Sequence, residues 1–127
     1  MNALLIQKEH LELILDGCKT WELRGKRTNI RGHIGLIESG SGTVVGVCEL
    51  VNCEGPFSVR ELRENAAKLC RKPREVVKPY KKTYAWVLAD AKRVQPPVAY
   101  EHPRGAVIWV KLKEPVARQI IRRIADA

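Results

Sequence analysis

The sequence is poor in the residue types that mark metal, redox and membrane proteins. Its four cysteines, Cys18, Cys48, Cys53 and Cys70, include no Cys-x-x-Cys pair, and only three histidines occur in the chain. This spacing argues against a zinc site and favours four reduced, mostly buried thiols, so we expect no metal and no cofactor. Apolar runs are far shorter than the ~20 residues that span a bilayer, and no signal peptide is visible. We therefore expect a cytoplasmic protein without a membrane segment.

Length and composition indicate an ordinary globular domain. The chain has 127 residues, of which 45% are hydrophobic and 29% charged. Domains most often contain about 100–150 residues, and a chain of this size buries enough surface to fold without cross-links. No repeat, low-complexity tract or linker is apparent. We predict a single domain over residues 1–127, which we expect to be a monomer.

Positive charge is concentrated in one part of the chain. The net charge is +9, yet residues 1–57 carry 6 basic and 7 acidic side chains, whereas residues 58–82 carry 9 and 3. Residues 83–127 carry 8 and 4. An excess confined to 25 residues predicts a surface patch that attracts polyanions such as nucleic acid, although a solvated helical face is the simpler alternative.

Hydrophobic periodicity predicts a mixed α+β domain. Strands are expected near residues 3–6, 18–24, 33–39, 44–51, 83–93 and 106–112, the second to fourth forming an antiparallel meander, with Pro96 and Pro97 ending the fifth. Helices are expected over 8–16, from the capping residue Ser58 to about Cys70, over 73–80 and over 115–127. Short strands with few helical crossovers favour a small barrel of about six strands flanked by helices.

One segment concentrates functional side chains: Gly17-Cys18-Lys19-Thr20-Trp21-Glu22-Leu23-Arg24. Strand alternation places Thr20, Glu22 and Arg24 on one face, and Lys19, at the junction of helix and strand, can reach the same side. The cations suit a phosphate or carbonyl and the carboxylate suits an amino group. The alternative is a charged cluster on a half-solvated strand.

This segment resembles the ASCH domain (activating signal cointegrator homology). The resemblance rests on Gly-x-Lys-Thr-x-Glu-x-Arg after a first strand and helix, then Arg31-Gly32-x-Ile34, Val45-Gly46-x-x-x-Leu50 and Tyr84-Ala85-Trp86-Val87-Leu88. It spans roughly residues 3–112. It implies a PUA-like β-barrel, a groove between the first helix and the barrel that is lined by Gly17, Lys19, Thr20, Glu22 and Arg24, and an association with RNA.

The resemblance also raises the question of catalysis. Some members of the family look like small hydrolases or nucleases that act on RNA or modified nucleosides. In the acetylated-cytidine amidohydrolase branch, a nucleophilic threonine follows the motif lysine by three positions, but Glu22 stands there in this sequence and Thr20 directly follows Lys19. This departure argues against that activity, while the glutamate form is common in the wider family.

Further candidates lie outside the motif. Glu49 shares a strand face with valines and could pair with Lys19 or Arg24, or simply sit at the barrel rim. Tyr84 could stack on a base, with barrel packing as the alternative. The best phosphate patch consists of Arg71, Lys72, Arg74, Lys78, Lys81 and Lys82, some of which are expected to be plain surface charge.

Three functions fit these observations. The first is a module that binds RNA or a nucleotide-like ligand in the groove while the patch contacts phosphates. The second is a hydrolase or ribonuclease in which Lys19 polarises or attacks the substrate and Glu22 is the general base. The third is an adaptor that binds a protein partner through its last helix. Binding is the interpretation that the sequence favours.

Overall fold

The structure is a computed structural model that describes residues 1–126. These residues form six strands: β1 Asn2–Ile6, β2 Trp21–Arg24, β3 Gly32–Glu38, β4 Thr43–Glu54, β5 Tyr84–Ala99 and β6 Trp109–Lys111. They also form three α-helices, α1 Lys8–Leu15, α2 Val59–Glu64 and α3 Glu114–Ala125, and two short 3-10 helices, η1 Ala66–Leu69 and η2 Pro73–Glu75. The mixed α+β class is therefore confirmed. Within residues 1–126, no helix is both long and apolar enough to cross a bilayer.

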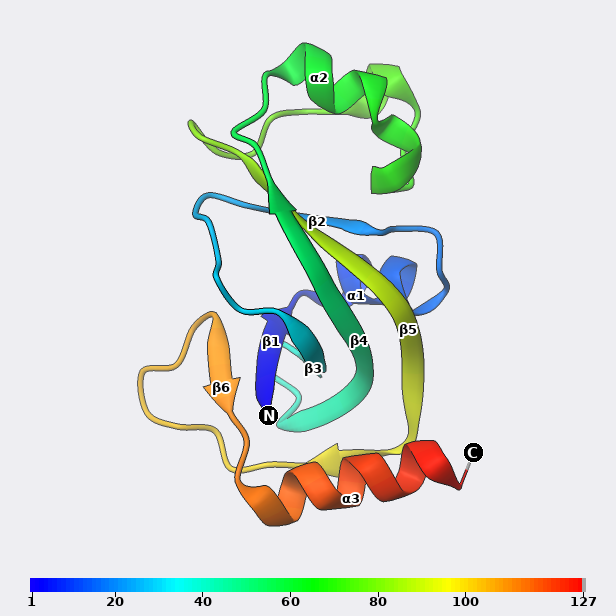
Figure 1. The fold of residues 1–127 in the computed structure, drawn as a ribbon, viewed down its shortest axis with the longest axis vertical. Coiled ribbons are helices and arrows are strands. Elements are labelled where there is room, and N and C mark those ends of the chain that lie inside the picture. The colour runs from blue at the N-terminus through cyan, green and yellow to red at the C-terminus, as the bar shows by residue number, and fades with distance from the viewer. Residues whose placement is uncertain (127) are drawn as a thin grey trace.

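All six strands belong to one sheet, in the order β2-β5-β4-β3-β1-β6. Only β1 and β3 run parallel, and the other neighbours are antiparallel. The long strands β4 and β5 bend strongly along their length, with α2 at one end and α3 at the other (Figure 1). Three register shifts along this pair supply the bulges that allow a sheet to curl.

The curl brings opposite parts of the sheet together. The rings of Trp86 on β5 and Trp109 on β6 stack with centroids 5.5 Å apart. Arg24 on β2 donates a hydrogen bond from Nη2 to the carbonyl oxygen of Leu5 on β1, over 2.9 Å. Strands that are far apart in sheet order thus meet across the interior, as the predicted barrel architecture requires.

Packing of α1 on the sheet depends on a glycine, Gly46, in β4. A Cβ atom on Gly46 would lie 2.5 Å from Leu15 Cδ2 and 2.9 Å from the carbonyl oxygen of Lys92. The second contact is with backbone, which cannot move aside cheaply. Gly46 therefore lets the C-terminal end of α1 press against β4 and β5, and this fixes where the chain enters β2.

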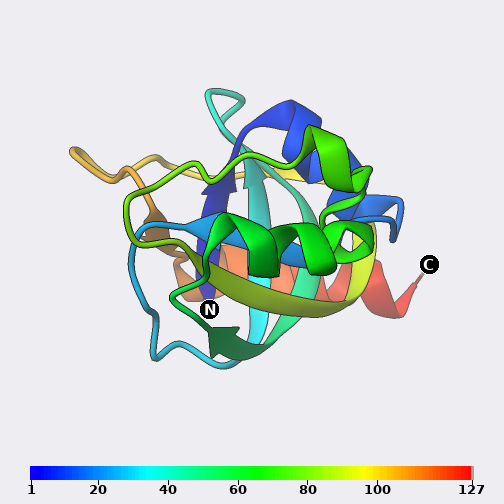
Figure 2. The same ribbon diagram turned by 90° about the horizontal axis from the view of Figure 1, so that it is seen from above.

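Residues 55–83 form an insert between two strands that are paired at its base. Glu54 at the end of β4 is opposite Ala85 on β5. The insert packs on the sheet through a small apolar cluster of its own, built from Trp21, Leu62, Ala66, Leu69, Val76 and Ala85. Seen from above, the insert lies over the sheet (Figure 2), and the backbone N–H of Thr20 donates to the carbonyl oxygen of Lys68 in η1. The insert thereby becomes a neighbour of the motif strand.

The predicted meander is wrong at its first connection. Strand β2 pairs with β5, and β3 pairs instead with β1 in parallel and with β4. A parallel pair needs a crossover, and the stretch containing α1 and β2 is that crossover. Sequence periodicity shows that a strand exists but not which distant strand accepts its hydrogen bonds.

Several element boundaries also differ from those predicted. Strand β5 continues through Pro96 and Pro97 to Ala99. The register of β4 against β5 shifts between Val44 and Gly46, so the two prolines lie in a bulge where no backbone N–H is needed for a hydrogen bond to β4. The helix that Ser58 caps, as predicted, ends at Glu64. Residues 66–69, expected to continue it, form a 3-10 helix. The predicted helix over 73–80 is only η2, the predicted strand over 106–112 is only β6, and the last helix begins at Glu114.

Candidate functional site

A cavity of about 570 Å³ lies between α1, β2 and the insert. We call its side on α1, β1 and β2 the floor and its side on residues 71–80 the wall. The floor presents mainly charged and polar groups, whereas the wall and the mouth are largely apolar. Floor residues are Leu5, Gln7, His10, Lys19, Glu22, Leu23 and Arg24, and wall residues are Arg71, Glu75, Val76, Val77, Pro79 and Tyr80.

The end of α1 places Lys19 on the floor. Gly17 has φ +81°, a left-handed conformation that terminates helices at little cost for glycine. The backbone N–H groups of Cys18 and Lys19 then both donate to the carbonyl oxygen of Leu13, 3.0 Å away in each case. This tight reversal turns the Lys19 side chain back over the helix it follows, where it is 7% exposed.

Lys19, Glu22 and Arg24 form a buried ion cluster. Lys19 Nζ lies 3.1 Å from Glu22 Oε1, and the other carboxylate oxygen accepts from Arg24 Nη2 at 2.9 Å and from Arg24 Nε at 3.1 Å. Arg24 also lies over the Trp86 ring, 5.5 Å from its centroid. Glu22 is 5% exposed, and a buried carboxylate is tolerated only when paired in this manner. The expectation that Lys19 reaches the face of Glu22 is confirmed.

His10 extends this cluster to α1. Lys19 Nζ lies 3.1 Å from His10 Nδ1. An ammonium group only donates, so Nδ1 accepts and the proton of the neutral ring resides on Nε2. Burial lowers the pKa of His10, and the charge of Lys19 lowers it further, against smaller opposite effects of Glu22 and Glu9. The imidazole is therefore held neutral beside the lysine.

The mouth of the cavity is unusually apolar for a protein surface. Val77 and Val107 are 74% and 78% exposed, and Tyr80 is 44% exposed. All three line the cavity. The Tyr80 ring rests on Gly25, whose Cβ, if present, would lie 3.2 Å from it. Exposed apolar side chains gathered around a charged recess favour a ligand with a flat apolar part and a polar end.

The structure brings together only part of the predicted site. Lys19, Glu22, Arg24 and Arg71 line the cavity. Gly17 shapes the turn, and Thr20 is exposed with its backbone paired to Lys68 and Leu88 rather than directed at the cavity. Lys72, Arg74, Lys78, Lys81 and Lys82 are exposed members of the wall and the segment that follows it, outside the cavity lining.

Glu49 and Tyr84 lie away from the cavity. Glu49 is half-buried on β4 opposite His33, and in the described residues the carboxylate that pairs with Lys19 and Arg24 is Glu22 alone. Tyr84 is half-buried against the core, with the Arg27 guanidinium 5.0 Å from its ring centroid. Trp86 and Trp21 are buried and pack in the core rather than facing a ligand.

Sequence reasoning named only four of the residues that line the cavity, and among those it missed, His10 and Tyr80 matter most for the chemistry of the site. His10 was one of three histidines scattered along the chain, yet it lies one helical turn before the buried Ile14 and so flanks the apolar face of α1. That position is the available signal. Tyr80, rather than Tyr84, is the aromatic ring at the mouth, and nothing in the sequence distinguishes the two.

The prediction of four reduced thiols is wrong for two of them. Cys18 and Cys70 form a disulfide with Cα atoms 5.3 Å apart, and only Cys48 and Cys53 are free and buried. The two bonded residues are separated by 52 positions. Their proximity arises from the docking of the insert on β2, which spacing along the sequence does not reveal.

Comparison with known proteins agrees with this architecture. The ASCH domain family matches residues 4–98. The crystal structure of ASCH from Zymomonas mobilis superimposes with a TM-score of 0.69 at 15% identity, covering 95% of this chain and 93% of that one. Two mutants of the Zymomonas protein give TM-scores of 0.68 and 0.66 at 16% identity, each covering 95% of this chain and 96% and 94% of theirs. No curated protein matches the chain in sequence. At such identity the structures establish a shared fold, and the family match over most of the sequence establishes that the chain belongs to the ASCH domain family.

Proposed function

We propose that this protein binds RNA or a nucleotide-like ligand, with one acceptor-bearing group held on the cavity floor. The observation that carries the proposal is the buried Lys19 ammonium. One of its three N–H donors faces His10 and one faces Glu22, which leaves one for a ligand. A buried donor of this kind calls for an oxygen acceptor, such as a phosphate or a base carbonyl.

The donor count of Arg24 supports the same ligand chemistry. Its Nη2 and Nε atoms are used by Glu22 and Leu5, whereas no partner of Nη1 occurs among residues 1–126. Both oxygens of Glu22 are meanwhile engaged by cations. The ion cluster of the floor therefore offers spare donors rather than spare acceptors, which favours an oxygen-rich ligand.

The mouth and the wall suit the rest of such a ligand. Stacking of a base on an aromatic side chain contributes about 1–3 kcal/mol, and Tyr80 is the exposed ring beside the cavity. The exposed cations that continue from the wall, up to Lys81 and Lys82, would contact neighbouring phosphates. Such contacts add affinity without selecting a sequence.

The test compares one buried and one exposed lysine. We expect Lys19→Ala to weaken binding of a fluorescein-labelled 12-nucleotide oligouridylate by at least about a hundredfold in fluorescence anisotropy, because an ionic donor and its floor geometry are lost. Lys8→Ala removes the same charge from the exposed start of α1 and should change affinity less than about threefold. Equal affinities of both variants and the wild type would refute the proposal.

A hydrolase acting on RNA or modified nucleosides is the second candidate, favoured by the neutral His10 ring beside a buried lysine. Both Glu22 oxygens are held by cations and His10 Nδ1 accepts from Lys19, so a substrate that draws the Lys19 ammonium away from either partner would free a proton acceptor on the cavity floor. With RNA and nucleoside substrates, His10→Asn and Glu22→Gln should each lower turnover by about 10²–10⁴ at nearly unchanged affinity if the site is catalytic. A pure binding site would show no turnover in the wild type and a roughly tenfold loss of affinity in Glu22→Gln.

A further inference from the structure

We propose that the Cys18–Cys70 disulfide is a redox-controlled latch that holds the cavity wall against its floor, and that a dithiol reductant releases it. The latch itself depends only on the structure. Its expected effect on RNA affinity rests on the proposed function.

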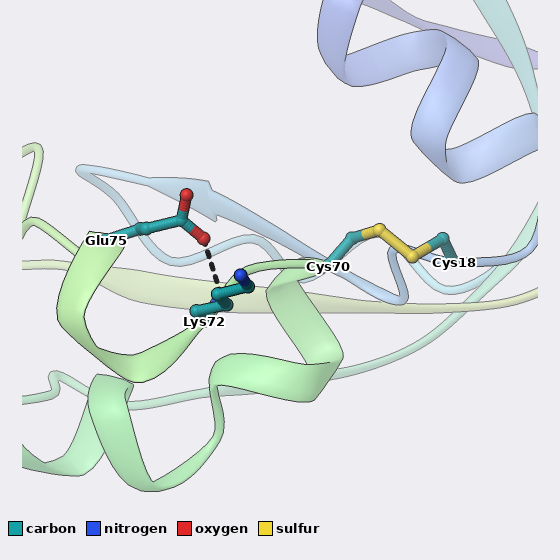
Figure 3. The surroundings of a disulfide bond; sticks show 4 residues. All are labelled: Cys18, Cys70, Lys72 and Glu75. Carbon is teal, nitrogen blue, oxygen red and sulfur yellow. Dashed lines mark hydrogen bonds between the residues drawn. A yellow bond between two sulfur atoms is a disulfide. The ribbon is translucent and has the colours of Figure 1, made fainter.

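The disulfide joins the two sides of the cavity at their functional residues. Cys18 directly precedes Lys19 on the floor, and Cys70 directly precedes Arg71, the first residue of the wall. Figure 3 shows the bond bridging the end of η1 and the chain that leads into β2. A single covalent bond thus sets the spacing between floor and wall.

The wall has few other attachments. Within the described residues, the backbone hydrogen bonds of residues 71–79 stay inside the insert, with Arg71 N donating to Ala66 O, Glu75 N to Lys72 O and Val76 N to Pro73 O. Val76 is the one buried side chain between residues 71 and 80. The far end is held by the hydrogen bonds between Tyr80 and Thr83 and by the Tyr80 ring against Gly25. Segments with so few buried contacts open locally at low cost in free energy.

The backbone at Cys70 indicates that the latch works against local preference. Cys70 has φ +57°, a left-handed conformation that side-chain-bearing residues adopt at a cost. Such conformations persist where the surroundings impose them. Cutting the disulfide removes one of these constraints at the point where the chain turns into the wall.

The two bonded cysteines are also more exposed than the two free ones, so they are the ones we expect a reductant to reach. Cys18 is exposed and Cys70 is half-buried, whereas Cys48 and Cys53 are buried. Burial raises the pKa of the Cys48 thiol to about 12, so that thiol does not compete in exchange near neutral pH.

The chemistry is ordinary thiol–disulfide exchange. A thiolate of the dithiol attacks one protein sulfur, the Cys18–Cys70 bond breaks, and the other cysteine leaves as a thiolate that takes up a proton. The second thiol of the reductant then displaces the first cysteine, so the dithiol becomes a cyclic disulfide and the protein gains two electrons and two protons. Reoxidation by a disulfide reverses each step.

The first test measures the wall itself by limited trypsin digestion of the full chain. Oxidised protein should be slowly cut after Arg71 and Arg74, and protein reduced with dithiothreitol should be cut at least about tenfold faster there, with two additional alkylated thiols by mass. Lys72 and Lys78 each precede a proline, and trypsin does not cleave a Lys–Pro bond, so cleavage within the wall is expected only after Arg71 and Arg74. Cys18→Ser should behave as reduced protein under both conditions, and Cys53→Ser should retain the response.

The second test asks whether the latch controls binding of the oligouridylate probe. If reduction leaves the wall closed only about a tenth of the time, the apparent dissociation constant rises about tenfold. Unchanged digestion after complete reduction, or absence of the disulfide in oxidised protein, would refute the latch. If Lys19→Ala weakens RNA binding and reduction speeds digestion but leaves the affinity unchanged, the site is real and the disulfide does not control it. If Lys19→Ala does not weaken RNA binding, the proposed function fails, and the digestion experiment still tests the latch by itself.

Discussion

The floor and the wall of the cavity are built by opposite means. The centre of the floor is an ion cluster in which Lys19 and Glu22 are buried, Arg24 and His10 are half-buried, and each member contacts another. The wall uses exposed residues joined by short-range contacts within the insert, one buried valine and a disulfide. A rigid floor suits discrimination among ligand groups, because its donors are fixed before binding. A loosely held wall that is largely apolar toward the cavity and carries exposed cations outside it suits enclosure of a ligand and attraction of phosphates.

The largest effect expected from this contrast concerns stability. Glu22→Ala leaves Lys19 and Arg24 buried without their shared anion, and we expect the free energy of unfolding to fall by about 3 kcal/mol. Glu75→Ala removes a cavity carboxylate from the exposed wall and should cost less than about 1 kcal/mol, the range of a single exposed hydrogen bond to Lys72 N. Urea unfolding of both variants measures the difference, and equal losses would remove the distinction between floor and wall.

A smaller effect concerns the salt dependence of RNA binding. If Lys81 and Lys82 contact phosphates, their joint replacement by alanine should flatten the slope of log affinity against log salt by about 1.4, from roughly 0.7 per contact on single strands. The loss should be similar for different RNA sequences. The joint replacement Arg118→Ala and Arg122→Ala removes two exposed cations from α3 at the far end of the sheet and is the matched control. A slope that is unchanged in the double variant would show that Lys81 and Lys82 do not contact phosphates.

The smallest effect concerns pH. The pKa of His10 is lowered in the folded protein, so the unfolded chain binds the proton first as pH falls below about 6.5. This contribution to stability is therefore complete above that pH and declines as pH approaches the folded pKa. His10→Asn should flatten the pH dependence of the unfolding free energy between pH 7 and 5, whereas His33→Asn, at an exposed position, should not. Identical profiles for wild type and His10→Asn would contradict the neutral His10 beside Lys19.

The two regions also differ in how far the sequence predicts them. Lys19, Glu22 and Arg24 follow from strand alternation and a terminating glycine, because their arrangement is local. The disulfide, the pairing of β2 with β5 and the position of Tyr80 depend on how the insert docks, which involves residues more than 50 positions apart. His10 is intermediate, since its helical position is predictable but its lysine partner, nine residues away, depends on the turn at Gly17. Local geometry is thus predictable from pattern, and long-range docking is not.

The pairing of Glu54 with Ala85 has a consequence for how such a protein can diversify. Since β4 and β5 are already neighbours where the insert leaves and rejoins them, the intervening 29 positions are topologically a hairpin loop. Loops in this position tolerate changes of length and composition far better than strands do. The wall can therefore be exchanged as a cassette while the barrel and the ion cluster stay in place, which makes the insert the natural route by which one scaffold acquires new ligands.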